Sequence, residues 1–213
     1  MRLSSILFKD KLENTLGKVK LNASLIRSFN IMPGDLVSII TTEEGTVQRA
    51  KWGFKRSGSK TVIITTVEQA NVHTKPSFRM AFRNRRCLLL IDSFYLWGHS
   101  DRVPCRFHHP ENHMLFVPGI YDYDEEDKSY SCCAIMRRSR HSIEKFSPLE
   151  PTCIEPGSWK DWVADKKVDE VIRFLNQTSL QALDKYRVSN KLLIKGFNKS
   201  LLHDHITEVP SLF

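Results

Sequence analysis

The sequence has 213 residues, of which 41% are hydrophobic and 26% charged, and it contains nine glycines and nine prolines. This length suits one domain, 1–213, with a substantial core, and the composition excludes collagen-like and disordered chains. Apolar runs such as Cys87–Ile91 are far shorter than the roughly 20 residues of a membrane span. Lys9 and Asp10 interrupt the apolar start, which argues against a signal peptide. We therefore expect a cytoplasmic protein, monomeric and without a membrane partner.

The positive charge is concentrated in one part of the chain. Of the formal net charge of +8, residues 49–106 carry twelve Lys or Arg against three Asp or Glu, which gives +9 there and −1 elsewhere. Such a segment favours an anionic partner, nucleic acid before membrane. A solvated basic surface without a function explains the same count equally well.

The five cysteines show no metal-binding or redox spacing. No CxxC pair occurs among them, and adjacent residues of a strand point to opposite faces. We expect free, buried thiols of a reducing compartment, no bound metal and no cofactor. The cysteines are Cys87, Cys105, Cys132, Cys133 and Cys153.

Periodicity and turn residues predict an α+β fold with a strand-rich core and flanking helices. In chain order they predict a helix at 10–16, strands at 35–40, 46–52 and 61–67, a helix at 77–84, one continuous buried strand at 87–97, and strands at 103–108, 114–121 and 130–136. A turn at 110–112 is expected to join the strands on either side of it as a hairpin. The part from 158 to 213 is expected to be helical, opening with a capping box at Ser158–Asp161.

Six phrases occur in the order and at the spacings found in the SOS-response-associated peptidase family, also called abasic-site-processing proteins. The resemblance covers about residues 30–160, and the ordered set of phrases is far more specific than any one of them alone. The phrases are Asn30–Gly34, Lys51–Phe54, Lys75–Arg79, Arg85–Leu88, Asp92–Trp97 and Gly119–Tyr121.

This resemblance implies a family-like β core and an activity on single-stranded DNA that carries an abasic site. In such proteins, a Cys directly after the initiator Met captures the aldehyde of the ring-opened sugar as a thiazolidine. An Asn, a Glu and a His from three further phrases position the reacting groups and move protons.

The positions that match these four residues carry other side chains here. They are Arg2, Thr66, Leu96 and Ser147. Glu68 and Leu149 stand where the resemblance places two DNA-contacting arginines. We therefore expect no intact catalytic residue and a pseudoenzyme that has lost the cross-linking reaction.

Aromatic and basic side chains nevertheless suggest contacts to DNA. A tryptophan can stack on an unpaired base, although core packing explains a buried tryptophan equally well. Arg79 and Arg83 share one helix face and could follow phosphates, or simply solvate that face. The DNA-binding candidates are Lys51, Trp52, Lys55, Arg79, Arg83, Arg85 and Trp97.

The richest histidine cluster comprises His108, His109 and His113 around the 110–112 turn. Two facing imidazoles without a third ligand make a poor zinc site, so an exposed hairpin tip is the better interpretation. His141 lies six residues before Ser147 and is a weaker candidate for the missing histidine.

Three hypotheses follow for the function. The first is noncovalent binding of single-stranded or damaged DNA by a degenerate family member. The second is a residual hydrolase or lyase that uses relocated groups such as His141 or Glu68. The third is a binding module for another ligand that reuses the family's groove.

Overall fold

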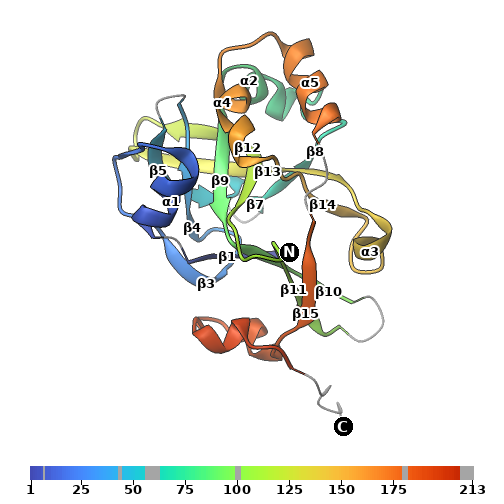
Figure 1. The fold of residues 1–213 in the computed structure, drawn as a ribbon. Helices are drawn as coiled ribbons and strands as arrows, with labels where there is room; N and C mark the ends of the chain where they lie inside the picture. The colour runs from blue at the N-terminus through green and yellow to red at the C-terminus, as the bar shows by residue number, and fades with distance from the viewer. Residues whose placement is uncertain (7, 43–44, 56–62, 99–101, 179–181, 207–213) are drawn as a thin grey trace.

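The computed structural model describes all residues except 7, 43–44, 56–62, 99–101, 179–181 and 207–213 (Figure 1). Strands form the core and helices lie around it, as the α+β prediction requires. The helices are α1 (Lys9–Leu16), α2 (Pro76–Asn84), α3 (His141–Glu144), α4 (Trp159–Val163) and α5 (Val168–Gln177), with 3-10 turns η1 (Pro156–Ser158), η2 (Asn190–Leu193) and η3 (Ser200–His203). No helix of this described part is long and apolar enough to cross a membrane.

An eight-stranded sheet contains a closed ring. Its strands follow the order β14 (Leu149–Pro151), β13 (Ser129–Arg138), β12 (Leu115–Asp124), β9 (Arg86–Ile91), β4 (Leu36–Ile40), β5 (Thr46–Trp52) and β2 (Lys20–Leu21), and β8 (Thr66–Glu68) pairs with β13. In addition, β13 pairs in parallel with β5, where Tyr130 is opposite Ala50. β13, β12, β9, β4 and β5 therefore close on themselves as a small barrel, which we call the strand ring.

A second, five-stranded sheet lies below the strand ring in Figure 1. Its order is β15 (Asp184–Arg187), β11 (Pro104–His108), β10 (Ser93–Trp97), β1 (Arg2–Ile6) and β3 (Arg27–Ile31). A two-stranded pair, β6 (Phe54–Lys55) and β7 (Ile63–Ile64), completes the described strands.

Alternating side chains of the strand ring enter two separate cores. On β9, Leu88 and Leu90 belong to an outer cluster that also contains buried residues of α1, α2, α4 and α5. Leu89 and Ile91 belong to an inner cluster that the strand ring shares with the five-stranded sheet. Because both faces of β9 are buried in this way, every residue from Cys87 to Ile91 is apolar. All five cysteines are buried free thiols, as predicted.

Three expectations about strand connection are wrong. The predicted strand at 87–97 is two strands, β9 and β10, in different sheets, because Asp92 leaves the ladder and accepts the N–H of Ile6 at 2.6 Å. The 110–112 turn joins β11 to β12, which also lie in different sheets, so it closes no hairpin. Of the predicted strand at 61–67, residues 61–62 are outside the described chain, and the remainder spans β7 and the start of β8.

The C-terminal part is less helical than expected. β15 pairs with β11 as an edge strand, because the 184–187 segment completes the hydrogen bonding of an otherwise open edge. Ser158 does not cap α4 with its side chain, since its backbone already belongs to η1. β1 and β3, which sequence patterns did not predict, supply the other side of the same sheet.

Candidate nucleic-acid interface

Helix α2 presents a basic face to solvent. Pro76 occupies its first turn, and the helix buries Phe78, Ala81 and Phe82 against the outer cluster. The 3.6-residue period then leaves Arg79 and Arg83 on the outside, both exposed. The predicted sharing of one face by these two arginines is confirmed, because both line the same hollow.

Two hollows adjoin along α2. One has a volume of about 420 Å³, and Arg79, Met80, Arg83 and His73 line it together with Phe82 and Val168. The other is a groove of about 640 Å³ between α2 and the β12–β13 hairpin. Met80, whose side chain is 53% exposed, lines both and forms the ridge between them. Neither this ridge nor His73 was among the residues singled out from the sequence.

The groove and the smaller hollow differ in charge. Lys51 and Arg85 line the groove, but so do Asp122, Asp124 and Asp127, and Arg85 pairs with Asp122 at 3.3 Å. Three carboxylates against two cations leave the groove unfavourable for phosphates. The smaller hollow, with its two arginines, is the better place for an anion.

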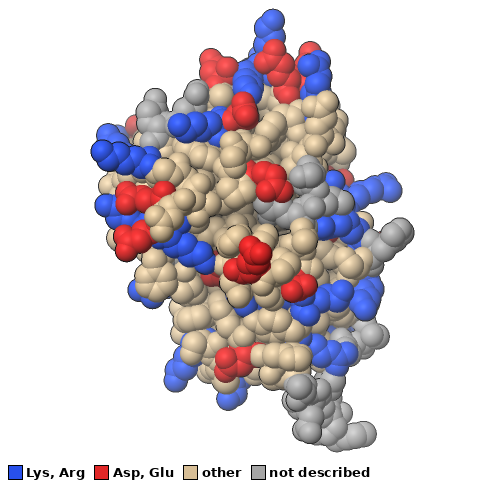
Figure 2. All heavy atoms as spheres, viewed as in Figure 1, with Lys and Arg blue, Asp and Glu red and all other residues tan. Residues whose placement is uncertain are grey.

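The basic segment does not form one basic surface. Arg86 and Arg106 are buried, and their guanidinium groups bind carbonyl oxygens and the Asp92 carboxylate, respectively. Figure 2 shows Lys and Arg dispersed among Asp and Glu on the face drawn. The +9 count therefore overstates the charge available to a ligand.

The remaining predicted DNA contacts lie apart from one another. Trp52 is 0% exposed and donates its indole N–H to the Thr65 carbonyl at 3.1 Å, so the stacking prediction is wrong for it. A tryptophan followed by a glycine is compatible with both a core and a surface position, so the Trp52–Gly53 pair could not reveal this burial. Trp97 is half-buried at the end of β10, a strand that Figure 1 shows on the other side of the strand ring from α2. Lys55 lies in β6, with its side chain outside the described part.

Comparison with known proteins identifies the family. The family model described as SOS response associated peptidase (SRAP) matches residues 1–193. The chain belongs to the SRAP family. Its six ordered phrases lie within the matched range, so the resemblance seen in sequence is confirmed.

Curated relatives of this SRAP chain are similar over about two thirds of its length. The abasic site processing protein YMR114C of Saccharomyces cerevisiae is 24% identical over 162 residues, which cover 70% of this chain and 44% of that protein. The chain thus matches less than half of the yeast protein. The abasic site processing protein YoqW of Bacillus subtilis is 22% identical over 157 residues, which cover 67% of this chain and 69% of the relative.

Solved structures share the SRAP fold of this chain. A protein from Bacteroides thetaiotaomicron superposes with a TM-score of 0.79 at 16% identity, covering 96% of this chain and 99% of that one. A protein from Bordetella bronchiseptica superposes with a TM-score of 0.74 at 14% identity, covering 88% and 99%. The α+β, strand-rich prediction is therefore confirmed.

Two of the four positions that the sequence resemblance predicts to match the family's reactive residues lie on adjacent strands of the SRAP chain. Arg2 is opposite Tyr95 in the β1–β10 ladder, and its guanidinium donates to Asn30 Oδ1 at 3.1 Å and to the Leu192 carbonyl. Leu96, on β10, is 3% exposed and belongs to the inner cluster. A guanidinium held by carbonyls and a buried alkyl group offer no nucleophile or base.

The other two positions adjoin β13 and its partners. Thr66 is half-buried on β8, opposite Ala134. Ser147 precedes β14, and its hydroxyl donates to the Leu149 carbonyl at 2.7 Å. The exposed Glu68 accepts a hydrogen bond from the Asn71 amide at 3.1 Å. His141 begins α3, and its side chain is outside the described residues.

Proposed function

We propose that this SRAP-family protein binds single-stranded or damaged DNA without forming a covalent adduct. The observation that carries the proposal is the exposed pair Arg79 and Arg83, which faces one hollow beside the exposed Met80. The relatives named as abasic site processing proteins support damaged DNA as the ligand class.

The geometry of α2 suits phosphates of a single strand. Residues four apart on a helix are separated by about 6 Å along the axis and project from the same face. Two guanidinium groups placed this way can each donate to a phosphate oxygen, which holds a strand without reading its sequence. Met80 between the two hollows offers an apolar contact to a base or sugar.

The chemistry at the matched positions supports noncovalent binding. Thiazolidine formation requires a free thiol next to a free amine, and Arg2 stands where the resemblance places that Cys. Burial raises the pKa of the Cys87 and Cys132 thiols well above their usual range. All five thiols are buried, which disfavours a thiolate nucleophile.

The test compares labelled single strands with and without one abasic site on native and denaturing gels. We expect a shift that weakens with salt on native gels and no retained adduct after denaturation. Replacing both α2 arginines, R79A/R83A, should lower the slope of log affinity against log salt by about 1.4, or roughly 0.7 per lost phosphate contact.

A matched control removes the same charge elsewhere. K195A/K199A also deletes two exposed cations, but from the C-terminal segment, which Figure 1 draws at the opposite end of the molecule from α2. This variant should keep most of the affinity and the slope. Equal losses of affinity for the labelled strand in the two double variants would show that only net charge matters, and would contradict the α2 site.

The other outcomes separate the remaining hypotheses. A denaturation-resistant adduct on the abasic strand would overturn the noncovalent mechanism. Strand cleavage at the abasic site would instead indicate a residual lyase. No shift at low salt would overturn DNA binding and favour a module for a different ligand.

A further inference from the structure

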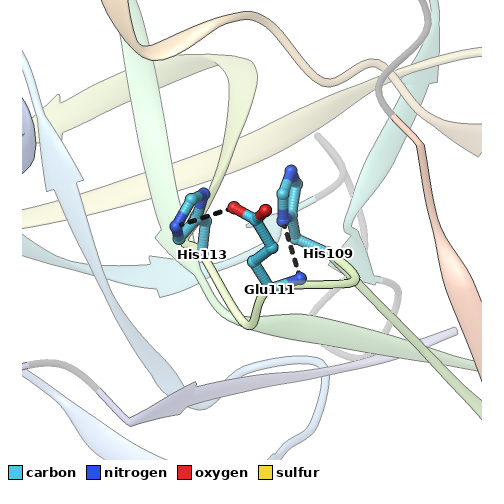
Figure 3. A group of neighbouring side chains, drawn as sticks. All are labelled: His109, Glu111 and His113. Atoms are coloured by element: carbon cyan, nitrogen blue, oxygen red, sulfur yellow. Dashed lines mark hydrogen bonds and ion pairs between the residues drawn. The ribbon is translucent and has the colours of Figure 1, made fainter.

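Three side chains meet at the turn between β11 and β12, outside the α2 interface (Figure 3). They are His109, Glu111 and His113, and one potential ligand atom from each lies within 4.8 Å of the other two. Glu111 Oε2 is 3.4 Å from His113 Nε2, and the two imidazole rings stack with centroids 4.6 Å apart. Two imidazoles and one carboxylate are the donor types that zinc prefers.

The spacing of these atoms is close to that of a tetrahedral site. Zinc bonds of about 2.0–2.2 Å to nitrogen and oxygen place neighbouring ligand atoms about 3.4 Å apart. Glu111 and His113 already have that separation. The His109 nitrogen must move closer, within a group whose ligand atoms all lie within 4.8 Å of one another.

The backbone of the turn is held in place without a metal. The Asn112 N–H donates to the His109 carbonyl at 2.8 Å, and Asn112 adopts a left-handed conformation (φ 54°) that asparagine tolerates well. Lys11 of α1 donates to the Asn112 carbonyl at 2.6 Å. Metal binding would therefore order side chains on a turn that is already shaped.

The side chains themselves are free to adjust. Stacked rings direct their nitrogen lone pairs along nearly parallel planes, so chelation requires the rings to rotate out of the stack. Glu111 and His113 are exposed and His109 is half-buried, so such rotations are fast and meet few contacts. The Glu111 N–H, which donates to His109 Nδ1 at 3.2 Å, would be released to water or would keep that nitrogen while Nε2 turns to the metal.

One of the two imidazoles differs from the pair considered in sequence, where His108 is expected to face His113. His108, the other histidine of the cluster, is buried on β11, with its ring edge against Tyr186 and its Nδ1 2.7 Å from the His109 carbonyl. His109 takes its place as the second imidazole, and Glu111 adds a carboxylate. From the sequence, a zinc site is disfavoured because two imidazoles lack a third ligand. Glu111, within the turn itself, is that ligand.

We propose that this turn binds one divalent transition-metal ion of the zinc type through His109, Glu111 and His113. Three protein ligands leave a fourth position for water or for a ligand of the metal. We do not expect Mg²⁺ or Ca²⁺ to bind here, because both ions favour sites made of oxygen atoms.

The experiment titrates the full chain, with its cysteines reduced, with ZnCl₂ in competition with a chromophoric chelator. We expect one equivalent to bind at neutral pH, and H109N, E111Q and H113N each to weaken binding at least tenfold. MgCl₂ should not compete. Affinity should fall as the pH is lowered, because zinc binds imidazole and carboxylate groups only in their deprotonated forms.

A control histidine and a second spectroscopic readout make the result decisive. H205N removes another exposed histidine, outside the cluster, and should leave zinc binding unchanged. Unaltered near-UV circular dichroism would show that each variant is folded. Undiminished binding by H109N/H113N, a thiolate charge-transfer band with CoCl₂, or no binding by the unmodified chain would each overturn the proposal.

Discussion

Arg86 lies between the ends of two helices, with only 5% of its surface exposed. Its guanidinium donates to the Phe82 and Arg83 carbonyls in the last turn of α2 and to the Trp162 and Ala164 carbonyls at the end of α4. The last carbonyls of a helix have no partner within the helix. One buried cation therefore caps two helix ends at once.

We predict that R86A strongly destabilises the fold. A buried carbonyl left without a donor costs about 1–3 kcal/mol, and two of the four, those of Phe82 and Trp162, are buried, so R86A should lower the free energy of unfolding by at least about 2 kcal/mol. Urea unfolding measures this change in the free energy of unfolding. R83A, which removes a neighbouring but exposed guanidinium, should change stability by less than about 0.5 kcal/mol. Similar midpoints for the two variants would contradict the capping role.

Sequence could predict some of these residue roles and not others. The four-residue spacing of Arg79 and Arg83 is local, and it correctly placed both on one helix face. The role of Arg86 depends on a carbonyl 76 residues further along the chain, which no local pattern reveals. Trp52 beside a glycine is compatible with a core or a surface, and only the closure of the strand ring decides that it is buried.

At the scale of elements, Gly53 marks the point where the chain leaves β5 for β6. Its φ of 132° lies in a region that L-residues with a side chain rarely adopt. A Cβ there would lie 1.9 Å from Ile63 Cγ2 on β7. Both the backbone conformation and the packing of β7 therefore require a glycine.

We predict that G53A lowers stability by more than about 2 kcal/mol, because backbone strain and overpacking add. G157A provides the control. A Cβ at Gly157 meets nothing within 4 Å and its φ is ordinary, so alanine there should be neutral or stabilise by about 0.4–1 kcal/mol. Thermal unfolding of both variants is the measurement, and equal midpoints would show that β7 yields readily to a new side chain.

Elements defined by local pattern were predictable, whereas their sheet assignment was not. α1, α2, and the β4–β5 hairpin follow from periodicity, proline and glycine positions. The division of the apolar run at Asp92 depends on the distant N–H of Ile6, and β15 is an edge strand with few buried side chains. Sheet membership depends on partners distant in sequence, so nothing in the local sequences of β11 and β12 shows that they belong to different sheets.

Across the whole molecule, the C-terminal segment returns to the first strand. His203 on η3 lies with its Nε2 2.9 Å from the Ser4 hydroxyl and 3.9 Å from Asp92. Burial, reinforced by Arg106 and by His108, lowers the pKa of His203 to about 4, although Asp92 and Asp204 oppose the shift. The imidazole therefore stays neutral in the folded protein at neutral pH.

This gives stability a defined pH dependence. Below the ordinary histidine pKa of about 6.5, the unfolded chain takes up a proton that folded His203 does not, so stability falls as the pH drops from about 6.5 towards 4. Burial lowers the pKa of His108 as well, which acts in the same direction. We predict that H203N loses less unfolding free energy between pH 7 and pH 5 than the unmodified protein.

Urea unfolding at pH 5, 6 and 7 provides the comparison. H205N, which changes an exposed histidine of the same segment, should follow the unmodified protein at every pH. If H203N also followed it, His203 would not be the group that couples protonation to folding.

The parallel pairing of β5 with β13 has a consequence for how the chain is made. During synthesis, β4, β5, β9 and β12 leave the ribosome before β13, so the nascent ring has open edges at β12 and at the Ala50–Trp52 end of β5, which β2 does not cover. Closing it joins segments far apart in sequence, which slows folding. Until then both edges can pair with other chains. We therefore expect chains ending before residue 129 to aggregate, and chaperones to matter most just before β13 emerges.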